Sequence, residues 1–114
     1  MRIENVGKML NQAIPTTDGN LWFVRDVAVT MDDDITYIFD LVTQVPVKSS
    51  PNQQYYHMTR VLEQKIKLRL IKTEYAKNNI YELKCGGTQW NGYCDDINTI
   101  NKFISVLADK LPNY

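Results

Sequence analysis

LWFVRDVAVTMDDDITYIFDLVTQV, which is residues 21–45, decides the fold that the sequence predicts. Two runs rich in β-branched and aromatic residues, 21–30 and 35–45, flank the short segment 31–34, which contains three aspartates. Runs of this kind favour β-strands, and a compact polar connection between them favours an antiparallel hairpin. Alternation in the second run places Tyr37 and Phe39 on one face and Ile38 on the other. The sequence therefore predicts a hairpin over 21–45.

Helical periodicity marks both ends of the chain. Apolar residues at intervals of three and four predict a short amphipathic helix over residues 3–14, stopped by Pro15. Near the other end, we expect Asp95 or Asp96 to cap a final helix and Pro112 to end it. The apolar stripe of this final helix consists of Ile97, Ile100, Ile104, Leu107 and Leu111, bordered by Phe103.

A long central helix is expected after the hairpin. Ser50 is a suitable N-cap, Pro51 suits the first helical position, and Gln53 follows the cap by three residues. Apolar residues continue at helical spacing beyond this start, and good helix formers extend to about Asn78. However, residues 65–70 also alternate strictly between basic and apolar side chains. The helix could therefore end near Gln64 and give way to a basic strand, so both interpretations of residues 65–74 are retained.

Residues 80–85 have the composition of a further strand. Together these elements predict an α+β fold, in which a small antiparallel sheet packs with a long central helix and with N- and C-terminal helices. The sheet would consist of the hairpin 21–45 and the strand near 80–85. At 114 residues, without a repeat or a long linker, the chain is expected to form one domain over residues 1–114.

Cys85 and Cys94 are the only cysteines, and they flank a glycine-rich segment that could turn the chain back on itself. We expect a disulfide between them, which would stabilise the fold by roughly 2–3 kcal/mol. Such a bridge would indicate an exported protein, periplasmic or secreted. If the two thiols are free, the expectation becomes a cytoplasmic protein.

The charges balance overall but are unevenly distributed. Thirteen basic residues match thirteen acidic ones, which argues against a strongly basic nucleic-acid binder. Residues 1–47 contain three basic and seven acidic residues, whereas 48–84 contain eight basic and three acidic. An alternative function is therefore nucleic-acid binding through segment 60–77. The residues of that candidate surface are Arg60, Lys65, Lys67, Arg69 and Lys72.

The residues that could support catalysis are sparse. Asp32, Asp33 and Asp34 lack the alternating spacing of a calcium-binding loop, so we expect no metal. His57 is the only histidine, and no nucleophile elbow, phosphate-binding loop or histidine pair accompanies it. We therefore expect neither a cofactor nor an enzymatic activity, and a small hydrolytic enzyme is the further alternative.

Aromatic side chains point instead to protein recognition. Seven tyrosines and two tryptophans in a neutral chain could supply contact residues, because these side chains bury a large area while retaining a polar group. No apolar run approaches the ~20 residues of a membrane span. We expect a non-catalytic protein-binding module, an accessory, assembly or inhibitor (immunity-like) subunit whose partner is another protein. Trp90, Tyr93 and Gln89 are the expected contact residues.

Overall fold

The computed structural model describes residues 6–16, 19–46, 59–71 and 79–112. Its strands pair in sequence order, each antiparallel to the next, in one six-stranded sheet. The elements are a 3-10 helix η1 (Val6–Met9), β1 (Ala13–Pro15), β2 (Leu21–Met31), β3 (Ile35–Pro46), β4 (Thr59–Ile71), β5 (Ile80–Cys85), β6 (Thr88–Tyr93), a 3-10 helix η3 (Cys94–Asp96) and α1 (Ile100–Lys110).

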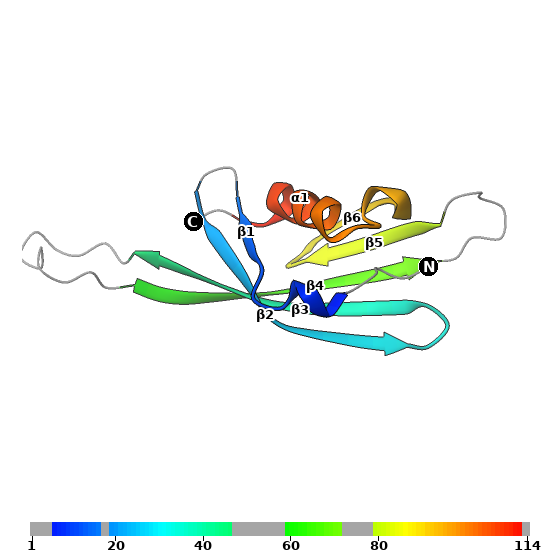
Figure 1. The fold of residues 1–114 in the computed structure, drawn as a ribbon, viewed down its shortest axis with the longest axis horizontal. Helices are drawn as coiled ribbons and strands as arrows, with labels where there is room; N and C mark the ends of the chain where they lie inside the picture. Colours follow the sequence, from blue (N-terminus) through cyan, green and yellow to red (C-terminus); the bar gives the residue numbers. More distant parts are fainter. Residues whose placement is uncertain (1–5, 17–18, 47–58, 72–78, 113–114) are drawn as a thin grey trace, which may run out of the picture.

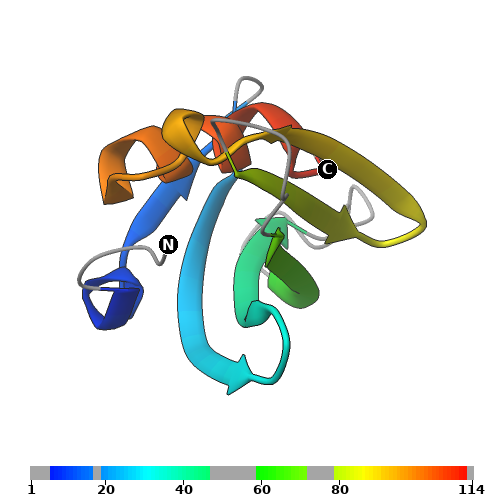
Figure 2. The same ribbon diagram turned by 90° about the vertical axis from the view of Figure 1, so that its right-hand side faces the viewer.

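The sheet curls around one helix. Helix α1 lies along one side of the sheet, and the strands bend around that side (Figures 1 and 2). We call the side that carries α1 the inner face and the opposite side the outer face. Trp22, Phe39, Leu68 and Leu83 are fully buried on the inner face. The Phe39 and Phe103 rings, 5.1 Å apart between centroids, connect the sheet to α1.

The predicted hairpin over 21–45 is confirmed. β2 and β3 pair over nine residue pairs, from Trp22 with Thr43 to Met31 with Ile35. The alternation in β3 is also confirmed, because Tyr37, Phe39 and Leu41 are all buried while the residues between them are partly exposed. One irregularity, a β-bulge, shifts the register between Val24 and Asp26.

The prediction of a long central helix is wrong. Residues 59–71 form strand β4, which pairs with β3 on one side and β5 on the other. The proposed helix start at 50–53 lies outside the described residues. Leu62, Ile66 and Leu70 are spaced by four, and this spacing keeps residues on one face of a helix and on one face of a strand. Leu68, two residues from Ile66 and fully buried, fits only the strand. The alternation of residues 65–70 was therefore the correct signal, and pairing on both edges outweighed helix propensity.

The predicted N-terminal helix over 3–14 is also wrong within the described residues. Only the 3-10 turn η1 forms there, and Asn11 has a φ of 64°, a left-handed conformation that no α-helix continues through. Ile14 then pairs with Trp22 in the sheet. The C-terminal helix is confirmed, although Thr99, and not Asp95 or Asp96, is its N-cap: the Thr99 hydroxyl accepts a hydrogen bond from the Lys102 amide.

The strand over 80–85 is confirmed, and the glycine-rich segment after it contains a strand that the sequence analysis missed. Gly86 and Gly87 form a two-residue connection, with Gly86 at φ 60° as tight hairpin turns require. Residues 88–93 then return along β5 as β6. The expected α+β fold is thus corrected to a curled antiparallel sheet with one short C-terminal helix.

Candidate protein-binding surface

The outer face is a series of cross-strand rows, because residues paired across neighbouring strands point to the same side. Phe23, Val42 and Glu63 form one such row, and Ile38, Lys67 and Lys84 form another. No described helix or strand covers this face (Figure 2). Within the described part of the chain, its side chains are therefore left without a covering layer.

An apolar patch occupies one end of the outer face. Leu21 and Phe23 are each 43% exposed, and Val61 is 56% exposed. Together with the partly exposed Val42 they line a depression to which Thr43 and Gln44 also contribute. We define Leu21, Phe23, Val42 and Val61 as the outer patch. The Thr43 hydroxyl is buried beneath it and donates a 2.6 Å hydrogen bond to the Leu21 carbonyl, which fixes β2 against β3 there.

A charged network borders the outer patch. Arg25 Nη2 and Nε donate to Asp40 Oδ2 at 2.7 and 3.1 Å, and Arg25 Nη1 donates to Glu63 Oε1 at 2.8 Å. Arg25 lies within the β-bulge, and these two partners lie on β3 and β4. The hydrogen bond to Asp40, followed by that to Glu63, raises the pKa of Arg25. The bulge thus links three strands beside an apolar surface, giving a polar rim to an apolar centre.

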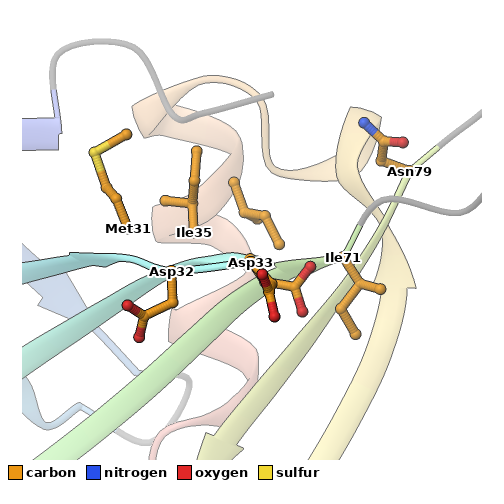
Figure 3. Close-up of a pocket in the computed structure, with 8 residues that line it drawn as sticks. Met31, Asp32, Asp33, Ile35, Ile71 and Asn79 are labelled. Carbon is orange, nitrogen blue, oxygen red and sulfur yellow. The ribbon is translucent and has the colours of Figure 1, made fainter.

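A second hollow lies at the opposite end of the sheet, beside the turn of the β2–β3 hairpin. Met31 and Ile35 point to one side of the turn, and the carboxylates of Asp32 and Asp33 lie on the other, while Asn79 approaches from the start of β5 (Figure 3). Among the described residues, no group of three or more histidines, cysteines or acidic residues is arranged to hold a metal ion. The hollow is therefore lined by both apolar and acidic groups, and its described residues do not form a metal site.

The five basic residues predicted to form a nucleic-acid surface do not all lie together in the structure. Lys65, Lys67 and Arg69 share the outer face of β4, and Lys67 lies directly opposite Lys84 of β5. Arg69 is occupied by acidic neighbours, Glu82 at 3.5 Å and Asp34 at 3.9 Å. Arg60 lies at the far end of β4, opposite Val45, and Lys72 lies outside the described residues, as does His57.

The three expected contact residues of β6 do not share a surface. Trp90 pairs with the buried Leu83 on the inner face, is partly buried against the core, and carries the Lys110 ammonium 5.5 Å from its ring centroid. Gln89 pairs with Lys84 on the outer face. Tyr93 is 57% exposed and pairs with Ile80 at the end of the sheet away from the outer patch. The alternation of β6 separates Trp90 from the other two.

The predicted disulfide is absent, since Cys85 and Cys94 are both free and buried. Cys85 ends β5 and pairs with Thr88, whereas Cys94 follows Tyr93, which pairs with Ile80 at the other end of the same hairpin. At least five residue steps along the strand, or roughly 17 Å, therefore separate the two cysteines, which is too far for a bridge. Burial raises the pKa of both thiols, which makes them poor nucleophiles. The expectation of an exported protein depended on the bridge and loses that support.

Comparison with protein-family models, curated proteins and solved structures found no match of any of the three kinds. Within the described part of the chain, no helix is both long and apolar enough to cross a membrane. The outer patch is a candidate surface that sequence reasoning missed. Leu21 and Phe23 alternate with the core residues Trp22 and Val24, but only the register with β3 and β4 brings Val42 and Val61 beside them.

Proposed function

We propose that this protein is a non-catalytic protein-binding module whose main contact surface is the outer patch. The observation that carries this proposal is the cluster of large, half-exposed apolar side chains on neighbouring strands, with no described element over it. An exposed apolar cluster with a polar rim is typical of protein interfaces. The partner expected is a protein with its own apolar surface and polar groups that meet the rim of Arg25, Asp40 and Glu63.

The chemistry of the described residues supports binding over catalysis. The two buried thiols have raised pKa values, the opposite of what an activated nucleophile requires. The aromatic side chain Phe23 can supply the large contact area that dominates binding energy at interfaces. An accessory, assembly or inhibitor role remains the proposed class, with the outer patch replacing the β6 segment as its main contact surface.

The test compares capture of native partners by three purified forms of the protein, using cross-linking in extracts of the cells from which the sequence comes. Phe23→Lys places a charge in the centre of the outer patch, and Thr30→Lys places the same charge on an exposed β2 position of the same face outside it. A partner captured by the wild type and by Thr30→Lys, and lost or at least tenfold weaker with Phe23→Lys, supports the proposal. Equal capture by all three forms overturns it.

The second candidate, nucleic-acid binding, is favoured by one specific observation. Lys67 and Lys84 lie directly opposite each other on β4 and β5, with Lys65 nearby on the same face. Like charges in such positions repel, and although Glu82 lies 3.4 Å from the Lys84 ammonium, a bound phosphate would further relieve this repulsion. A fluorescence titration with single-stranded oligonucleotides tests this candidate. Binding that weakens steeply with salt and is lost in Lys67→Glu supports it, and no binding at about 50 mM salt removes it.

A further inference from the structure

Beyond Val24, β2 has no described strand neighbour on one edge, although the 3-10 helix η1 contacts β2. β1 pairs with β2 only from Leu21 to Phe23, and beyond them the Val24 amide donates to Gln12 while its carbonyl accepts from Asn11. No described strand pairs with residues 25–31 on that side. An unpaired strand edge is a template for a further strand, whether from a partner or from a second copy.

The backbone groups that face this edge can be identified. In an antiparallel strand, consecutive residues direct their amide and carbonyl groups to opposite sides, and the bulge at Val24 to Asp26 shifts this alternation by one residue. The Val27 amide donates to the Asp26 side chain at 2.9 Å, so it does not pair with β3. The backbone groups that face the open edge are therefore those of Val27, Val29 and Met31. One of these donors, the Val27 amide, is already bonded to the Asp26 carboxylate.

We propose that two copies of this chain associate by pairing these edges antiparallel about a two-fold axis through Ala28. In this register Val27 of each copy lies opposite Val29 of the other, and Asp26 lies opposite Thr30, whose hydroxyl replaces the Val27 amide as the donor to the carboxylate. Residues whose backbone groups point to the free edge must lie opposite each other for the two strands to form hydrogen bonds. Other registers that meet this condition differ by moving the two-fold axis one residue along the strand. Moving the axis to Val29 sets Asp26 opposite Asp32, a repulsive pair.

The composition of the edge fits a second copy. Across residues 27–31 the strand carries Val, Ala, Val, Thr and Met, and Val29 is 46% exposed. These side chains are neutral and mostly β-branched or apolar, which suits cross-strand pairing with an identical segment. An edge of this length is well below the 20–30 residues a side of standard interfaces, so the dimer is expected to be weak and concentration-dependent.

The test is analytical ultracentrifugation over about 10 µM to 1 mM, the range that detects weak association. The wild type is expected to shift from the 13.3 kDa monomer towards twice that mass as the concentration rises. Val29→Lys, which puts a charge on the edge, should remain monomeric, whereas Val61→Lys, the same change on the central strand β4, should associate with the same concentration dependence as the wild type. A wild type that stays monomeric throughout overturns the proposal.

Hydrogen exchange on the wild type gives an independent readout that requires no variant. The Val27 and Val29 amides should gain protection at least fivefold between dilute and concentrated samples, while the Ala28 amide, which faces β3, should not change. Dimerisation without this protection, or loss of the dimer in Val61→Lys but not in Val29→Lys, would place the contact elsewhere and overturn the edge pairing. Neither result affects the capture of a different protein through the outer patch around Phe23. The dimer proposal and the protein-binding proposal can therefore be overturned independently.

Discussion

The Tyr81 side chain lies directly against the Gly92 backbone across the β5–β6 pair. A Cβ atom built on Gly92 would come within 2.6 Å of the Tyr81 ring and hydroxyl, closer than real contacts allow. The absence of a side chain at residue 92 is what lets the ring pack against the strand, with an exposed fraction of only 6%. This contact fixes the end of the sheet that precedes η3 and α1.

Gly92→Ala should therefore destabilise the protein by about 1–3 kcal/mol, the usual cost of overpacking a well-filled site. Chemical denaturation monitored by fluorescence measures the change. The matched control is Gly87→Ala, because a Cβ there meets nothing within 4 Å and the residue is not left-handed. Its effect should stay within about 0.5 kcal/mol. Equal losses in the two variants would contradict the packing argument.

Tyr81 also predicts a pH dependence. Burial, followed by the negative charges of Asp96 and Cys94, raises the pKa of its hydroxyl above the ordinary value of 10.0. The unfolded chain therefore loses this proton at lower pH than the folded chain does. The free energy of unfolding should decline as the pH rises from about 10 towards the folded pKa.

Tyr81→Phe keeps the ring over Gly92 and removes the titrating group. Thermal midpoints measured between pH 8 and pH 11 should decline less steeply in this variant than in the wild type. The part of the alkaline decline that arises from the buried thiols should remain, because their pKa values are also raised. Parallel pH profiles of variant and wild type would show that Tyr81 does not titrate differently in the fold.

Local patterns predicted those elements whose partners are close in sequence. The hairpin over 21–45 closes through three aspartates, and α1 carries its own stripe around Phe103 and Leu107, so both follow from neighbouring residues. β4 could not be assigned in this way, because the stripe through Leu62 and Ile66 fits two periodicities and the decision depended on pairing with β3 and β5. The outer patch depended on the same register, which explains why sequence reasoning selected β6 instead.

The free state of Cys85 and Cys94 can be tested by counting thiols. Two free thiols should be counted by a chromogenic disulfide reagent in denaturant without reductant, because the hairpin holds the two side chains at opposite ends. In the native protein both should react at least tenfold more slowly than a free cysteine, since burial lowers the thiolate fraction. A count of zero in denaturant would show that the cysteines are bridged and would contradict the strand register.

Trp22 connects the sheet to the end of the chain. Its ring is fully buried, and its Nε1 donates a 3.2 Å hydrogen bond to the carbonyl of Pro112, directly after α1. Trp22→Phe should cost about 1–3 kcal/mol, because it leaves that carbonyl without this donor and opens space in the core. The control is Phe23→Leu on the opposite, half-exposed face, which should change the thermal midpoint by much less. Equal changes would contradict the role of Trp22.

Replacing Trp90 tests whether its side chain serves core packing or partner binding. The ring is partly buried on the inner face and contacts the core, and the Lys110 ammonium lies 5.5 Å from its centroid. Trp90→Ala should therefore lower stability by about 1–3 kcal/mol through lost packing, and Lys110→Met, which keeps the aliphatic stem, should cost at most about 1 kcal/mol through the lost cation–π contact. Denaturant titrations of both variants and of the double variant measure the coupling between the two residues. If Trp90→Ala left the free energy of unfolding unchanged but weakened partner capture, Trp90 would be a contact residue, and the assignment of its ring to the core would be wrong.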